Sequence, residues 1–112
     1  MELSIFIPLL KIDDLHEDRG KLIKINTSSI ALFYHQGQIY AVENNCPHQG
    51  GNLSEGYIHD GKIFCPLHHW SFDLKTGAYS FNASMKIKTY ITVIRDGMIY
   101  INLNGQDETD NV

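Results

Sequence analysis

The sequence predicts an all-β protein, a small antiparallel sandwich or barrel. Three pairs of short apolar or β-branched runs are each separated by two residues that favour a tight hairpin turn. Only the segment 13–20 could hold a helix, of one or two turns at most. Many short strands joined by regular turns are typical of small sandwiches and barrels.

The expected strands follow from local patterns, taken in chain order. The apolar run 3–9 predicts a first strand, and the partly alternating segment 21–25 predicts a half-buried second strand. Asp-Gly is a preferred pair where both central residues of a turn need positive φ. Three hairpins are therefore expected, with strands at 30–35 and 38–43, at 58–59 and 62–64, and at 91–95 and 98–102.

Length and composition indicate one ordinary soluble domain. The chain has 112 residues, 43% of them hydrophobic and 20% charged, which is enough to bury a core without disulfides. We expect a single domain over 1–103 and a short polar tail over 104–112. The formal net charge of −4 gives no support to a nucleic-acid partner, which favours a basic surface.

The apolar run 5–10 does not predict a membrane segment. It is far shorter than the ~20 residues that a membrane helix needs, and no basic leader precedes it. We therefore expect no membrane partner and a cytoplasmic location, where thiols stay reduced and can bind metal.

Two short motifs, each with one cysteine and one histidine, contain the candidate metal ligands of the sequence. Cys46-Pro-His48 and Cys65-Pro-Leu-His68 contain the only two cysteines of the chain, and sixteen residues, 49–64, separate the pairs. Both pairs fall beside expected strand ends, so two loops of one rigid sheet can bring the four side chains together. The pattern predicts four ligands of one metal centre.

Zinc is one candidate for this centre, because it accepts two thiolates and two imidazoles. Its usual sites, however, pair like ligands and separate them by two or more residues, whereas each loop here offers one cysteine and one histidine. That order favours a 2Fe–2S centre in which both cysteines hold one iron and both histidines hold the other. Such a centre is neutral when oxidised, so it accepts an electron more readily than a four-cysteine cluster does.

These residues resemble the motif of the Rieske iron–sulfur family, and the similarity extends over about 3–103. The resemblance implies a Rieske-type β-fold with two cluster-binding loops. It also implies a 2Fe–2S cofactor that transfers one electron at a time. The implied ligands are Cys46, His48, Cys65 and His68.

The sequence departs from the high-potential members of that family. Those proteins carry a disulfide between the two loops and hydroxyl groups that hydrogen-bond to the cluster sulfurs. The positions that match the disulfide are Gly51 and Leu67, and those that match the hydroxyl residues are Trp70 and Phe72. The resemblance therefore implies a disulfide-free protein in the lower half of the Rieske potential range.

The disulfide-free branch contains two functional groups. The stretches 46–56, 65–77, 88–90 and 96–100 resemble the small subunit of assimilatory NAD(P)H nitrite reductase, and 79–88 lacks the proline frequent in dioxygenase ferredoxins. The first hypothesis is therefore a nitrite reductase small subunit, and the second is a ferredoxin for an aromatic-ring dioxygenase. Either needs a redox partner protein: a reductase large subunit, or an oxygenase plus its reductase. A zinc-stabilised structural subunit is a more remote hypothesis.

The other candidate residues have simpler explanations. The sequence has no phosphate-binding loop, nucleophile elbow or paired-carboxylate pocket, so we expect a carrier and not an enzyme by itself. We expect Trp70 in the core and His69 at the exposed rim of the metal centre. The histidines without ligand spacing are expected at the surface or in turns: His16, His35 and His59. Three glycines are expected where positive φ or a close backbone approach is needed: Gly50, Gly51 and Gly77.

Overall fold

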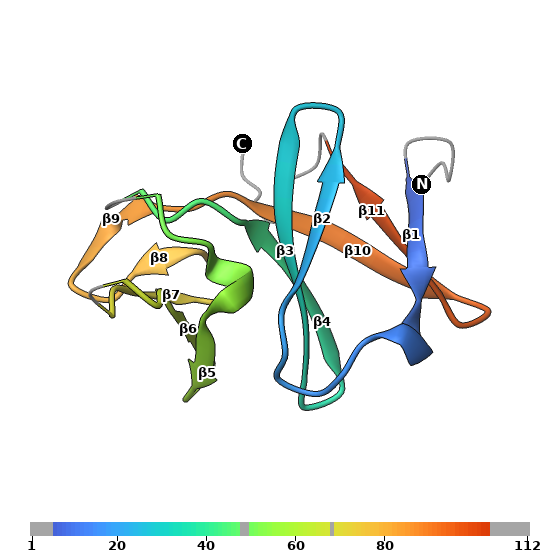
Figure 1. Cartoon of the computed structure of the whole chain (residues 1–112), viewed down its shortest axis with the longest axis horizontal. Helices are drawn as coiled ribbons and strands as arrows, with labels where there is room; N and C mark the ends of the chain where they lie inside the picture. Colours follow the sequence, from blue (N-terminus) through green and yellow to red (C-terminus); the bar gives the residue numbers. More distant parts are fainter. Residues whose placement is uncertain (1–5, 48–49, 68, 104–112) are drawn as a thin grey trace.

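In the computed structural model, which describes residues 6–47, 50–67 and 69–103, the chain folds into strands with two short 3-10 turns (Figure 1). The strands of the larger sheet are β1 (Ile7–Lys11), β2 (Lys21–Ile25), β3 (Ser28–His35), β4 (Gln38–Glu43), β10 (Thr89–Arg95) and β11 (Met98–Asn102). Those of the smaller sheet are β5 (Tyr57–His59), β6 (Lys62–Phe64), β7 (Ser71–Asp73), β8 (Ala78–Tyr79) and β9 (Asn82–Lys86). The 3-10 turns are η2 (Ile12–Asp14) and η3 (Leu53–Glu55).

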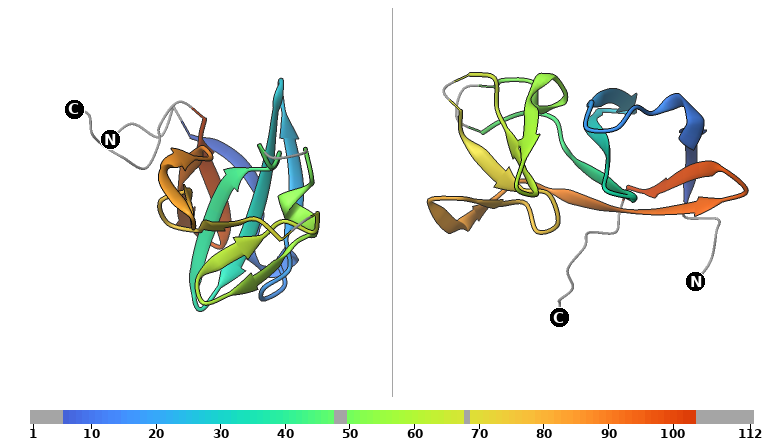
Figure 2. Two further views of the ribbon diagram at one scale, coloured as in Figure 1. Left: turned by 90° about the vertical axis from the view of Figure 1, so that its left-hand side faces the viewer. Right: turned by 90° about the horizontal axis from the view of Figure 1, so that it is seen from below.

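The two sheets confirm the prediction of an antiparallel all-β fold. The larger sheet has the strand order β1-β11-β10-β4-β3-β2, and the smaller sheet has the order β5-β6-β7-β8-β9. The smaller sheet lies at one end of the molecule, and β10 leads from it into the larger sheet (Figures 1 and 2). Within the described ranges, no helix has the length and apolar character that a membrane span requires.

The three predicted hairpins are all present. Their turns are Gln36-Gly37, Asp60-Gly61 and Asp96-Gly97, and the six turn residues have φ between 51° and 80°. Positive φ at both central positions gives a turn whose twist matches that of the two strands, which is why glycine follows a polar residue each time. The predicted strand at 21–25 is confirmed as β2.

Two predictions near the N-terminus are wrong in part. The first strand begins at Ile7 and extends to Lys11 instead of ending at residue 9, and residues 1–5 lie outside the described ranges. The expected helix within 13–20 is only the single turn η2, which begins at Ile12. The chain then becomes extended because Glu17 forms a β-bridge with Tyr34, and the Asp18 N–H donates to the Tyr34 carbonyl at 2.8 Å.

The strands β7, β8 and β9 were not predicted. β7 and β8 are three and two residues long, too short for a periodic pattern to emerge. Every residue of β9 is exposed, so its sequence shows no alternation between apolar and polar positions. The predicted polar tail, 104–112, lies outside the described residues.

β3 separates two hydrophobic core clusters. Successive side chains of a strand point to opposite faces, so Ala31 and Phe33 enter one cluster while Ile30 and Leu32 enter the other. All four are fully buried, which explains the unbroken apolar run at this point of the sequence. The cluster that contains Phe33 also contains Cys46 and Cys65.

Candidate metal centre

Cys46 and Cys65 are the two members of the predicted ligand set that the structure describes. Each is only 1% exposed, and both belong to the same core cluster. Neither forms a disulfide. His48 and His68 lie outside the described residues.

The first loop follows β4 and is closed around Cys46. The Cys46 N–H donates to the Gly51 carbonyl at 2.9 Å, and the Gly50 N–H donates to the Cys46 carbonyl at 2.8 Å. Gly50 has a φ of 72°, which glycine adopts without the penalty that other residues meet. The loop therefore returns on itself directly after the first cysteine.

Asn44 fastens this loop to the segment that follows it. Its side-chain nitrogen donates to Oδ1 of Asn52 at 2.9 Å, and its side-chain oxygen accepts from the Ser54 N–H at 2.9 Å. Asn44 is buried, so both bonds satisfy groups that water does not reach. Sequence reasoning missed this residue. The only available signal was a polar side chain two positions before an expected ligand.

The second loop joins β6 to β7. The Cys65 N–H donates to the Trp70 carbonyl at 2.7 Å, which closes the loop at its base. The half-buried Trp70 ring packs against the core cluster and stacks on Tyr79, with ring centroids 4.2 Å apart. Trp70 is therefore a core aromatic, as predicted, and it lies at the edge of the core. His69 is exposed, as predicted.

The two loops meet at Gly51. A Cβ placed on Gly51 would lie 2.6 Å from the Cys65 sulfur and 3.3 Å from Cγ of Leu67. Real Cβ atoms essentially never lie as close to another atom as 2.6 Å, so no residue with a side chain fits at position 51 without movement. The expectation of a close approach at Gly51 is confirmed, and Gly77 has the expected positive φ, 80°.

The fold and the site agree with the comparison with known proteins. A family model for the Rieske [2Fe-2S] domain matches residues 6–91. The chain belongs to the Rieske [2Fe-2S] family. It is 44% identical over 82 residues to the 3-phenylpropionate/cinnamic acid dioxygenase ferredoxin subunit of Photorhabdus laumondii, and the match covers 71% of this chain and 78% of that protein.

Solved structures of Rieske proteins have the same fold. The ferredoxin of Sphingomonas yanoikuyae B1 superposes with a TM-score of 0.79 at 28% identity, covering 87% of this chain and 97% of that chain. The structure of a protein described as a nitrite reductase NADPH small subunit superposes with a TM-score of 0.79 at 25% identity, covering 86% of this chain and 96% of that chain. The cofactor of the family is the Rieske 2Fe–2S cluster, and the chain functions in Rieske-type electron transfer.

The described residues fit the cysteine side of a Rieske cluster. Two thiols lie in one dry core, and the loops that carry them touch at Gly51, where no Cβ covers the Cys65 sulfur. The hydroxyl of Ser71, next to Phe72, lies 2.5 Å from the Ser80 hydroxyl and is engaged there. The side chains at positions 70 and 72, Trp70 and Phe72, have no hydroxyl group.

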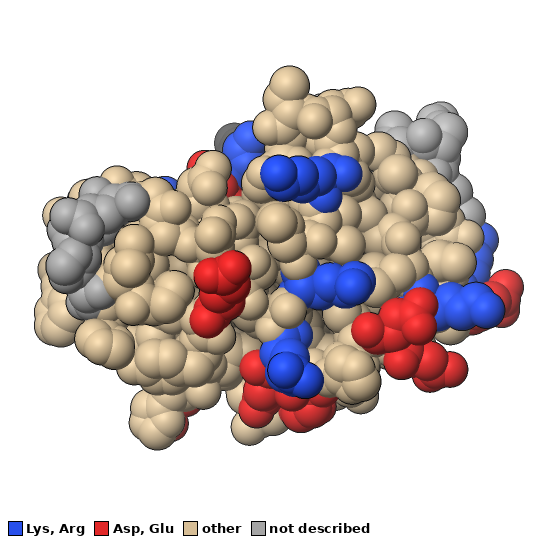
Figure 3. Space-filling model, in the orientation of Figure 1, with Lys and Arg blue, Asp and Glu red and all other residues tan. Residues whose placement is uncertain are grey.

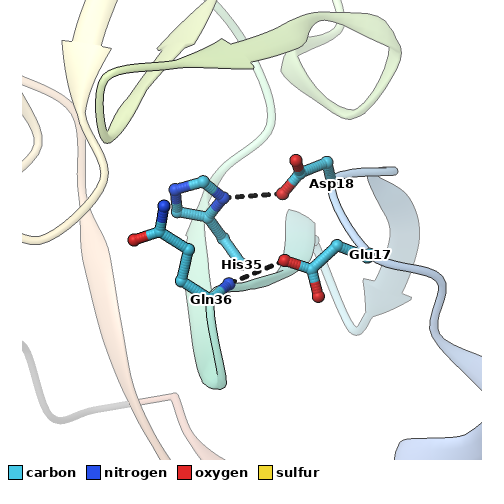
Figure 4. A network of polar contacts seen from close by, with 4 residues as sticks. All are labelled: Glu17, Asp18, His35 and Gln36. Atoms are coloured by element: carbon cyan, nitrogen blue, oxygen red, sulfur yellow. Dashed lines mark hydrogen bonds and ion pairs between the residues drawn. The ribbon is translucent and has the colours of Figure 1, made fainter.

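His35 was expected at the surface or in a turn, and it lies directly before the Gln36-Gly37 turn, where it pairs with Gln38 and its side chain is only 12% exposed. Its Nδ1 lies 2.6 Å from Oδ1 of Asp18, and the Glu17 carboxylate accepts from the Gln36 N–H at 2.8 Å (Figure 4). The β-bridge between Glu17 and Tyr34 brings these groups together. His16 and His59 are exposed, as predicted.

The ligand atoms of Glu17, Asp18 and His35 lie within 4.8 Å of one another. The contacts in Figure 4 account for this grouping, because they fasten the segment that precedes β2 to the β3–β4 hairpin. Sequence reasoning did not anticipate the cluster, since His35 is 17 positions from Asp18 in the chain.

One ionisable side chain of the larger sheet has a shifted pKa. Burial, and then the nearby Glu43 carboxylate, raise the pKa of Tyr90, while a hydrogen bond with Ser28 partly opposes them. Tyr90 belongs to the core cluster on the other face of β3 from the two cysteines.

Proposed function

We propose that Cys46, His48, Cys65 and His68 hold the Rieske cluster, with the cysteines on one iron and the histidines on the other. Support comes from the spacing of the four residues and from the two buried thiols on loops that meet at Gly51. When bound, the cluster supplies reversible one-electron transfer. The proposed electron-transfer domain spans 1–103, with 104–112 as a tail.

The function that we propose is delivery of single electrons, as a Rieske ferredoxin, from a reductase to the oxygenase component of an aromatic-ring dioxygenase system. The observation that carries it is the 44% identity to a dioxygenase ferredoxin subunit, of which the match covers 78%. A solved ferredoxin of similar length supports the role of a ferredoxin, since 97% of that chain is covered.

The small subunit of an NAD(P)H nitrite reductase is the second candidate. It was the first hypothesis from the sequence, and it remains a prediction. The stretches 46–56 and 65–77 favour it, and the protein described above as such a subunit has the same fold at 25% identity. Both candidates require a protein partner that receives or donates one electron.

The described surface of the two loops is uncharged. Residues 46–47, 50–51, 65–67 and 69–70 include no Asp, Glu, Lys or Arg, and Leu67 is 45% exposed. On the face seen in Figure 3, the Lys and Arg side chains are concentrated over the middle and right of the molecule. A partner protein that binds these loops would therefore rely on shape complementarity and apolar contact more than on charge, so ionic strength should affect its association only weakly.

Electron transfer to two defined acceptors tests the proposal. The protein is purified anaerobically and reduced, and we expect a red-brown colour and a rhombic EPR signal. It is then mixed with the oxygenase component of a 3-phenylpropionate dioxygenase or with the sirohaem large subunit of a nitrite reductase. We expect faster reoxidation by the oxygenase. Reoxidation by the sirohaem subunit alone would establish the second candidate, and a colourless protein with stoichiometric zinc would overturn both.

A further inference from the structure

His69 has a backbone conformation that glycine adopts more easily. Its φ is 60°, in the left-handed region, where a side chain costs on the order of 1 kcal/mol. Among the described residues of the two loops, it is the only non-glycine residue with positive φ. Such a conformation persists when surrounding contacts hold it in place.

Tyr57 supplies those contacts. Its hydroxyl oxygen lies 3.3 Å from Nδ1 of His69, and the two rings meet edge to face with centroids 6.1 Å apart. A phenol O–H can donate to Nδ1 of a neutral imidazole that carries its proton on Nε2. Tyr57 therefore contacts the residue that directly follows the proposed ligand His68.

The same tyrosine contacts the other end of the loop. Tyr57 is paired with Phe64 across β5 and β6, and their rings stack with centroids 4.9 Å apart and planes within 5°. Phe64 directly precedes Cys65. One side chain thus touches both residues that flank the segment 65–68, although Tyr57 itself is 47% exposed and its burial alone contributes little to the core.

We propose that Tyr57 is a positioning residue for the second cluster loop. By stacking on Phe64 and holding His69 in the left-handed conformation, it fixes both ends of the segment that carries Cys65 and His68. This role rests on the ligand set proposed above. It acts through His69 and Phe64, and Tyr57 itself is not a ligand.

Amide hydrogen exchange of Cys65 and the rate of cluster loss to a chelator test this role. The Cys65 N–H donates to the Trp70 carbonyl and so reports whether the loop is closed. Tyr57→Phe keeps the ring stack and removes only the hydroxyl. We expect about fivefold faster exchange and cluster loss, as for one lost hydrogen bond. Tyr100→Phe makes the same chemical change on β11 and should alter neither rate.

A double-mutant cycle distinguishes positioning from a general effect. In His69→Gly, the glycine adopts positive φ without a contact from Tyr57. Tyr57→Phe should therefore not change the exchange rate of the Cys65 amide any further in that background. His69→Ala keeps the conformational cost without the contact and should exchange faster than His69→Gly. Equal effects of Tyr57→Phe in both backgrounds, or no effect in the natural one, would overturn the proposal. If the Rieske EPR signal is absent, the ligand proposal fails, while exchange on the same sample still decides whether Tyr57 holds His69.

Discussion

Gly51 and Cys65 belong to different loops, yet a Cβ on Gly51 would lie 2.6 Å from the Cys65 sulfur. The side chain of Leu67 lies against the same point. In high-potential Rieske proteins, the positions that match 51 and 67 carry the disulfide that joins the loops. In this chain, close packing of Gly51 and Leu67 stands where those proteins have the disulfide. The contact between the two loops therefore depends on the absence of a side chain at position 51.

Gly51→Ala should therefore disrupt the centre. The new methyl group must displace the Cys65 sulfur or Leu67, and overpacking of this kind costs about 1–3 kcal/mol. We expect loss of most of the bound iron and a lower midpoint of chemical unfolding. Gly50→Ala is the matched control, because a Cβ there meets open space and adds only the cost of positive φ. Equal iron content in both variants would contradict the steric explanation.

Substitution of the proposed ligands should separate two effects. Cys65→Ala removes a thiolate ligand and should abolish the cluster and destabilise both loops. His68→Cys adds a negative charge to the centre, so any cluster retained should have a much lower reduction potential. Iron analysis and redox titration followed by EPR measure both outcomes. A normal cluster spectrum in Cys65→Ala would show that the ligand assignment is wrong.

The reduction potential should fall in the lower half of the Rieske range, which runs from roughly −150 to +300 mV. Trp70 and Phe72 offer no hydroxyl to the cluster sulfurs, and the Ser71 hydroxyl is engaged with Ser80. Fewer hydrogen bonds to sulfur stabilise the reduced state less. Protein-film voltammetry measures the midpoint, and a value near the positive end would refute this explanation.

Asn44→Ala should destabilise the first loop. The substitution leaves the part-buried Ser54 N–H and the Asn52 side chain without their partner, which costs about 1–3 kcal/mol. Urea unfolding of the iron-loaded protein measures the change. Asn45→Ala, at the exposed neighbouring position, should change the unfolding free energy by less than about 0.5 kcal/mol. Similar losses in the two variants would contradict a specific role for Asn44.

Stability should decrease at alkaline pH in part through Tyr90. Its pKa is higher in the folded than in the unfolded chain, where a tyrosine ionises near pH ~10. The folded state therefore keeps its full stability below that pH and loses stability as the pH rises toward the raised pKa. Tyr90→Phe should flatten this part of the profile in urea unfolding at several pH values. An unchanged alkaline slope would contradict the assignment.

The sequence could predict those parts of the fold that depend on neighbouring residues. The turns at Asp60-Gly61 and Asp96-Gly97 were predictable because positive φ at two successive positions strongly favours that pair. The close approach at Gly51 was predictable because Gly50-Gly51 lies within three residues of the proposed ligand His48. In each case the physical cause lies within a few residues.

Contacts between distant segments were not predictable. The contact between His35 and Asp18 joins residues 17 positions apart, and that between Tyr57 and His69 joins residues 12 apart. No periodicity in the sequence reports that such residues meet. β9 was missed for a different reason, because all of its side chains face solvent and their polarity is therefore unconstrained.

β3 contributes side chains to both hydrophobic core clusters. Phe33 on one face packs in the core cluster that contains the two cysteines, whereas Ile30 and Leu32 on the other face pack in the second core cluster. Loss of packing on the cysteine side should therefore disturb a strand on which the packing of the larger sheet also depends. Binding energy gained at a metal centre is folding energy. The supply of iron to this chain should thus govern its resistance to proteolysis as well as its redox activity.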